Sequence, residues 1–97
     1  MTTWFVSRHP GALEWMRENR IPFDRHEAHL DARAVHAGDT VIGSLPVNLA
    51  AEVCARGAIY RHLSLQLGVA DRGRELSALE LEKYEATLKT YEIKEVV

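Results

Sequence analysis

The sequence is poor in cysteine and in net charge, and both shortages restrict what the protein can be. Its 97 residues include one cysteine, Cys54, so no disulfide can form within the chain. Without a recognisable signal peptide, this predicts a reducing, cytoplasmic setting. The formal net charge is -2. That value argues against binding to long nucleic acid, because duplex DNA requires a basic surface.

Long apolar runs and nucleotide-binding signatures are also missing. The longest apolar stretches are much too short to span a membrane, so no membrane contact is expected. The chain has neither a G-x-G-x-x-G fingerprint nor a P-loop. No repeat, low-complexity tract or linker divides it, so we expect one domain over residues 1–97. A domain this small buries only part of its surface, and a dimer interface would help to stabilise it.

Apolar strands alternate with helical patterns along the chain. The expected strands are 2–7, 23–30 (at an edge), 40–45 and 59–65, and the expected helices are 11–19, 47–55 and 77 to about 91. The last helix begins with a capping box at Ser77 and Glu80, and the tail after it alternates as a short strand would. This order predicts an α/β fold, a small Rossmann-like three-layer sandwich. Its central sheet is mainly parallel, with about four strands and about three helices. Strands one and three lie side by side at its centre.

Two strand-to-helix junctions are built alike, one at residues 7–11 (SRHPG) and one at 43–48 (GSLPVN). The carboxyl ends of parallel strands meet at one edge of a sheet, where ligands bind. Arg8 can fork onto phosphate oxygens, and His9 can exchange a proton near neutral pH. Ser44 and Asn48 suit a ribose or a base edge. The alternative is structural: Arg8 and His9 in a solvated bend, and Asn48 capping a helix.

The segment at residues 26–31 (HEAHLD) looks like a metal site, but its histidines are one residue too close for H-E-x-x-H. On a strand, Glu27, His29 and Asp31 share one face and His26 points away. Three ligands this close on one strand rarely close around a metal, so we predict a polar edge-strand face and no metal.

A basic loop follows the fourth strand and contains Arg72, Arg74 and Glu75. These residues either lean over the same sheet edge as Arg8 or pair with the acidic last helix. His36 and His62 are isolated in the sequence and are interpreted as structural.

Three stretches of the chain carry a family resemblance. TTWFVSRHPGALEW at the start, GDTVIGSLPVNLAAEVCARGA in the centre and LSLQL with RGRELSALE near the end resemble small CRISPR-associated ancillary proteins of type III systems. These systems signal with cyclic oligoadenylates. The resemblance implies a compact Rossmann-like fold related to the sensor domains for these rings. It also implies a homodimer that acts as a ring nuclease without a cofactor.

The resemblance also assigns roles to residues. It carries over Arg8, His9, Ser44 and Asn48 as site residues, and we infer from their chemistry that Arg8 and His9 are catalytic and that Ser44 and Asn48 hold the ribose or adenine. Further candidate ligand-binding residues are Ser7, Pro10, Gly11, Gly43, Leu45 and Arg74. The implied reaction is a metal-independent attack by a ribose 2′-hydroxyl, which opens cyclic tetra-adenylate and leaves a 2′,3′-cyclic phosphate. One alternative is a non-catalytic module that sequesters the ring, and a remoter one is a structural partner of another CRISPR protein.

Overall fold

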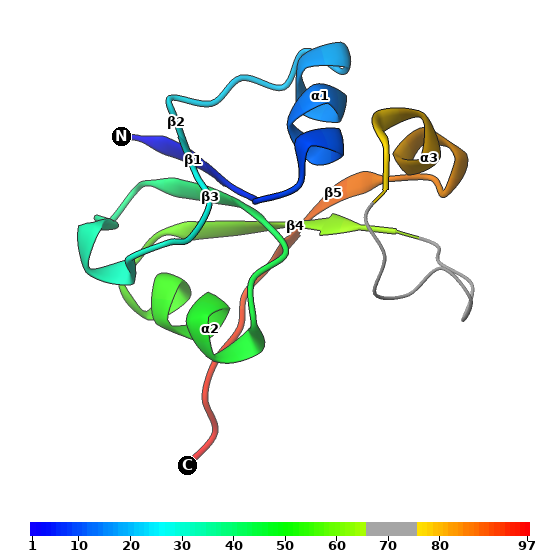
Figure 1. Cartoon of the computed structure of the whole chain (residues 1–97). Coiled ribbons are helices and arrows are strands. Elements are labelled where there is room, and N and C mark those ends of the chain that lie inside the picture. The colour runs from blue at the N-terminus through cyan, green and yellow to red at the C-terminus, as the bar shows by residue number, and fades with distance from the viewer. Residues whose placement is uncertain (66–75) are drawn as a thin grey trace.

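A five-stranded, mostly parallel sheet forms the centre of the protein in a computed structural model that describes residues 1–65 and 76–97 (Figure 1). Its strands, in spatial order, are β2 (Arg25–Glu27), β1 (Thr3–Val6), β3 (Thr40–Gly43), β4 (Ile59–Ser64) and β5 (Thr87–Tyr91). The first four are parallel, and β5 is antiparallel to β4. The predicted adjacency of the first and third strands and the edge position of the second are therefore confirmed.

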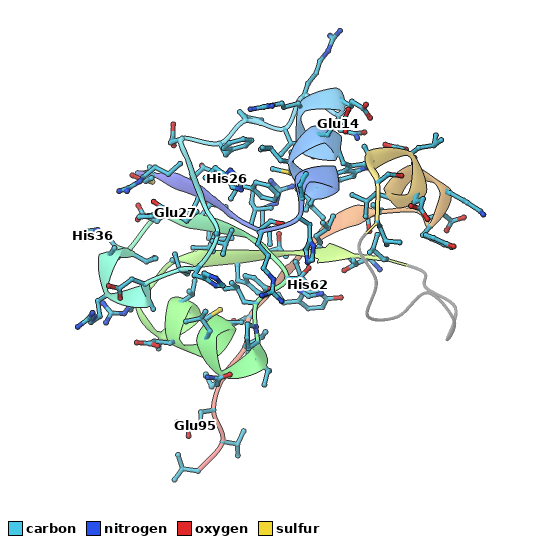
Figure 2. All side chains as sticks on the ribbon, in the orientation of Figure 1. Glu14, His26, Glu27, His36, His62 and Glu95 are labelled. Atoms are coloured by element: carbon cyan, nitrogen blue, oxygen red, sulfur yellow. The ribbon has the colours of Figure 1, made fainter. Side chains whose placement is uncertain are left out.

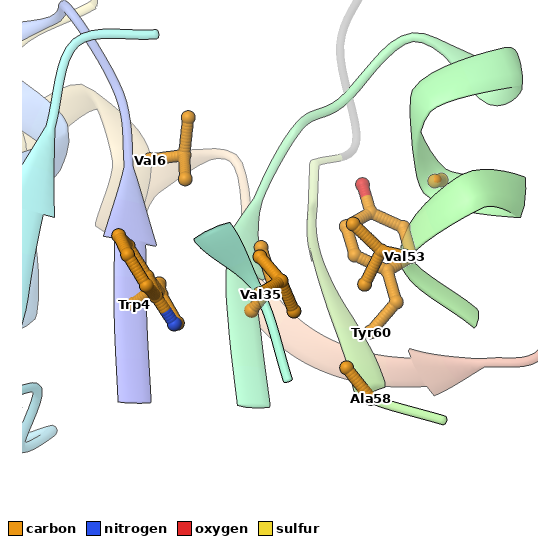
Figure 3. Packing of buried hydrophobic residues seen from close by; sticks show 8 residues of the cluster. Trp4, Val6, Val35, Val53, Ala58 and Tyr60 are labelled. Carbon is orange, nitrogen blue, oxygen red and sulfur yellow. The ribbon is translucent and has the colours of Figure 1, made fainter. Parts of the chain in front are cut away.

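Helices cover both faces of the sheet (Figure 1). The helices α1 (Pro10–Glu18) and α3 (Ala78–Lys83) lie on one face, and α2 (Val47–Ala55) and the 3-10 turn η1 (Ala32–Ala34) lie on the other. Side chains alternate along each strand, so Trp4 packs on the α2 side while Phe5 packs against α1. Figure 3 shows the core on the α2 side of the sheet, in which Val35 lies between Trp4 and the neighbouring side chains of Val53 and Tyr60. The result is a Rossmann-like α/β fold with three layers.

Both tryptophans are core residues. Trp4 packs in the core on the α2 side of the sheet, and Trp15 packs between α1 and the sheet; each is 4% exposed. In the part of the chain that the structure describes, no helix has the length and apolarity that crossing a membrane would need.

The expectation of a long last helix is wrong. The capping box at Ser77 is present, but α3 ends at Lys83, and Glu85 takes a left-handed conformation with φ 56°. The chain then forms β5 along β4. The apolar residues of this stretch fit a helical repeat by coincidence, whereas β5 supplies the hydrogen-bonding partners that the edge of β4 would lack. The residues after Tyr91 form no strand.

The end of one strand and the buried face of one helix also differ from the sequence interpretation. The strand β2 stops at Glu27, because β1 offers it only a short partner, so His29 and Asp31 lie beyond the sheet. The helical repeat of Val47, Ala50, Ala51 and Cys54 predicts that these residues form the buried face of α2. In the structure Val47 is instead 70% exposed, and Val53 is fully buried. Cys54, expected to be buried, is only partly covered.

Candidate functional site

A pocket of about 480 Å³ opens where β1 and β3 end, at the carboxyl edge of the sheet. It lies between the first and third strands, where the chain crosses to opposite faces of the sheet, as predicted. The described residues that line it are Phe5, Val6, Ser7, Arg8, His9, Ala12, Ala28, His29, Leu30, Gly43, Ser44, Leu45, Pro46, Leu49 and Leu63. Both predicted junctions therefore contribute to one pocket.

The bend after β1 is fixed by its own hydrogen bonds. The backbone N–H of His9 donates to the Ser7 hydroxyl oxygen at 3.1 Å. His9 is the N-cap of α1, and Pro10 occupies the first helical turn, where its missing N–H costs nothing. Arg8 and His9 are both exposed. The bend therefore holds an arginine and an imidazole at the mouth of the pocket, beside the positive end of α1.

The bend after β3 is held by β4. A Cβ atom on Gly43 would lie 2.5 Å from the Val6 carbonyl oxygen, so only glycine lets β1 and β3 approach this closely here. The Ser44 hydroxyl donates to the Leu63 carbonyl at 3.3 Å. The hydroxyl oxygen keeps a lone pair that a ligand hydroxyl could donate to.

A buried tyrosine lies behind this bend and was not singled out in the sequence. The Tyr60 hydroxyl accepts the Leu45 N–H at 2.9 Å and lies 3.2 Å from the Gly43 carbonyl and 2.6 Å from Nδ1 of His62. A phenol has one proton to donate, and the Gly43 carbonyl can only accept, so Tyr60 donates to Gly43. The Tyr60 oxygen then accepts from Nδ1 of His62 as well as from Leu45, and every polar group in this network has a partner. Burial raises the pKa of Tyr60 and lowers the pKa of His62, so both are neutral near pH 7.

A second histidine braces the bend after β1. The imidazoles of His26 and His62 project from β2 and β4 (Figure 2). The His26 ring stacks on Phe5, with 5.4 Å between ring centroids, and its Nε2 lies 2.8 Å from the Ser7 carbonyl oxygen. A carbonyl can only accept, so Nε2 carries the proton and donates it. The hydrogen bond between His62 and Tyr60 supports the structural interpretation of His62. The contacts of His26 with Ser7 and Phe5 give His26 a structural position as well.

The described lining residues give the pocket a positive charge from the Arg8 guanidinium. Arg8, His9 and His29 line it, and no aspartate or glutamate is among its described lining residues. Within residues 1–65 and 76–97, no carboxylate pairs with the Arg8 guanidinium. A guanidinium in this setting favours an anion such as phosphate.

Some predicted site residues lie elsewhere. Asn48 is exposed on the first turn of α2 and lines a second cavity of about 750 Å³, between α2 and residues 92–95. Pro10 and Gly11 do not line the pocket. A Cβ atom on Gly11 would collide with the Leu76 carbonyl, so the absence of a side chain at Gly11 lets α1 pack closely on the segment that leads into α3. Arg74 lies outside the described residues.

His29 is a pocket residue that the sequence interpretation placed on an edge strand. Because β2 ends early, the chain turns over the carboxyl edge of the sheet and carries His29 to the pocket wall. The expected face of Glu27, His29 and Asp31 does not form. Among the residues described, no cluster of three histidine, cysteine or acidic side chains could hold a metal ion.

Taken together, a Rossmann-like sheet and a cationic pocket at its topological switch point define an α/β protein with a candidate site for an anionic ligand. A model of the family described as "Putative CRISPR-associated protein (Cas_VVA1548)" matches residues 4–94. The chain therefore belongs to this CRISPR-associated family. No curated protein and no solved structure matches the chain.

Proposed function

We propose that the protein is a ring nuclease of a type III CRISPR system. It binds cyclic oligoadenylate, with cyclic tetra-adenylate as the favoured ring, and opens it without a metal, which ends the antiviral signal. The observation that carries the proposal is a pocket, in a CRISPR-associated chain, that combines an arginine and imidazoles with no described carboxylate. A phosphodiester carries the charge that such a pocket favours.

The reaction requires no group from outside the protein and its substrate. A ribose 2′-hydroxyl attacks the adjacent phosphorus, the bond to the 5′-oxygen breaks, and a 2′,3′-cyclic phosphate and a 5′-hydroxyl remain. Arg8 holds the phosphate oxygens and stabilises the extra negative charge as the attack proceeds. His9 transfers a proton, and Ser44 orients the ribose. Fixing the ribose so that the attack is in line supplies a further part of the rate.

The size of the pocket is relevant to the oligomeric state of the protein. A cavity of about 480 Å³ accommodates a small ligand, whereas a ring of four nucleotides is larger. The proposal therefore includes a homodimer whose two pockets share one ring, because a twofold axis presents each group twice to a ring with its own twofold symmetry.

The test measures binding and cleavage of cyclic tetra-adenylate in the presence of a chelator, with products separated by chromatography. Wild type should give linear products over many turnovers. Arg8→Ala should weaken binding about 10- to 100-fold and slow turnover, because a charged hydrogen bond to phosphate is lost. Arg17→Ala is the matched control, since Arg17 is exposed on the last turn of α1 and does not line the pocket.

The same assay separates the alternatives. An intact ring recovered from a tight complex would support the sequestering module instead of the enzyme. Failure to bind a cyclic oligoadenylate of any size would refute both.

A further inference from the structure

Opening a ring by 2′-hydroxyl attack requires two proton transfers. One group removes the 2′-hydroxyl proton as the oxygen–phosphorus bond forms. Another supplies a proton to the 5′-oxygen as its bond to phosphorus breaks. A single imidazole can perform only one of these transfers at a time, so a pocket that catalyses both steps well needs two.

The pocket has a second imidazole, His29. Val6 pairs with Glu27 across β1 and β2, and the Ser7 N–H donates to the Glu27 carbonyl at 3.0 Å. The two strands therefore end at the same level. His9 follows three residues after Val6, and His29 follows two residues after Glu27, so both side chains reach the pocket from neighbouring strand ends.

The two strand ends are also tied to each other. The His26 imidazole donates from Nε2 to the Ser7 carbonyl while its ring stacks on Phe5. This contact fixes the β1 bend against the end of β2, three residues before His29. Holding the two strand ends together limits how far the residues that follow them can move apart, and catalysis by two groups benefits from such positioning.

We propose that His29 is the second proton-transfer group, and that His9 and His29 form the acid–base pair of the ring-opening reaction. This inference rests on the proposed function. Of the two imidazoles, one takes the proton from the 2′-oxygen and the other delivers a proton to the departing 5′-oxygen. No water is consumed, and the product is an isomer of the ring.

Within residues 1–65 and 76–97, few charged groups belong to the pocket that His29 lines. Arg8 lines the same pocket from the bend after β1, and the polar side chain that lines it from the bend after β3 is Ser44. On the segment that carries His29, Glu27 is paired with Arg25 at 3.0 Å and Asp31 with Arg33 at 3.1 Å. A change in the pH dependence of cleavage on substitution of His29 would therefore not come from Glu27 or Asp31, because each of them is paired with an arginine.

The experiment compares wild type with His9→Gln, His29→Gln and the control His36→Gln, using cyclic tetra-adenylate and a chelator under single-turnover conditions. His36 is exposed and precedes β3, at the opposite end of the strands from the pocket. We expect each pocket variant to lose about 10²- to 10⁴-fold in rate, to keep its affinity for the ring within a few-fold, and to lose one limb of a bell-shaped pH profile. The control should match wild type.

A second substrate identifies which of the two histidines protonates the departing 5′-oxygen. In a linkage whose 5′-oxygen is replaced by sulfur, the leaving thiolate needs no proton, so the rate of one histidine variant should recover and that of the other should not. Cleavage by His29→Gln at the wild-type rate overturns this inference while the ring nuclease stands. A slower His29→Gln with an unchanged pH profile, or sulfur rescue of both variants or of neither, overturns it as well. A wild type that binds the ring without cutting it refutes the proposed enzyme and this inference together.

Discussion

At the scale of single residues, Asp39 is a buried carboxylate that lies at the end of the sheet opposite the pocket. It is 4% exposed and accepts hydrogen bonds from the backbone N–H groups of Thr2 and His36 and from the indole of Trp4, at 2.9 to 3.2 Å. The bonds from His36 and Thr2, with a smaller contribution from Trp4, lower the pKa of Asp39 to about 2. This carboxylate therefore links the first strand to the turn before β3.

We expect Asp39→Asn to lower the free energy of unfolding by about 1–3 kcal/mol at pH 7, because donors that now meet a carboxylate would meet an amide instead. The folded-state pKa lies below the ordinary value of 3.8. The difference in stability between wild type and variant should therefore be fully present above about pH 4 and should shrink as the pH falls toward 2. Urea unfolding followed by circular dichroism over this range measures it.

The control for this prediction is Glu14→Gln, which removes an exposed carboxylate from α1 (Figure 2). It should leave stability within about 0.5 kcal/mol of wild type. Equal stability of Asp39→Asn and wild type at pH 7 would show that the hydrogen bonds to Asp39 contribute nothing.

Some residues of the candidate site could be predicted from the sequence, and others could not. Arg8, His9 and Ser44 were predictable, because each directly follows a strand and parallel strands end together. Tyr60 and His29 were not. The role of Tyr60 depends on contacts with Leu45 and Gly43, fifteen and seventeen residues away. The position of His29 depends on where β2 stops.

At the scale of secondary-structure elements, local signals marked the helix starts and the end of α2, but they did not mark the ends of β2 and α3. Pro10 and the Ser77 capping box mark helix starts as expected, and Gly57, with φ 86°, follows the end of α2 as expected. The stretch after Lys83 fits a helix by its apolar spacing and a strand by its threonines and tyrosine. The free edge of β4 decides between them, and that edge is a property of the folded sheet.

Whether the substitution of Thr90 by alanine raises or lowers the stability of the protein shows whether this segment is a helix or a strand. In the strand β5, where Thr90 pairs with Arg61, Thr90→Ala should destabilise the protein by up to about 1 kcal/mol, because alanine is a poor strand residue. In a helix the same change would stabilise, because alanine has the higher helix propensity. Thr87→Ala, in the same strand, should shift stability in the same direction. Thermal or urea unfolding measures both, and stabilisation by both changes would contradict the strand.

At the scale of the whole molecule, the strand order brings the two junctions together. Residues 7–9 and 43–45 are far apart in the sequence, and the pairing of Val6 with Gly43 places the strands that precede them side by side. A sequence can predict this adjacency from the order of its elements. It does not predict how large a ligand the edge holds, because pocket size depends on how side chains from every strand end pack.

The pocket size leads to a prediction about stoichiometry. If two pockets share one cyclic tetra-adenylate, titration calorimetry should give half a ring per chain, and sedimentation should give a complex with twice the 11.0 kDa mass of one chain. A ring with methylated 2′-hydroxyls is the suitable ligand, because it lacks the attacking group and stays intact during the titration. Arg8→Ala should weaken the binding without changing the ratio, because the loss occurs equally in both pockets. A ratio of one ring per chain on a monomer would show that one pocket is sufficient, and the shared-ring dimer would then be wrong.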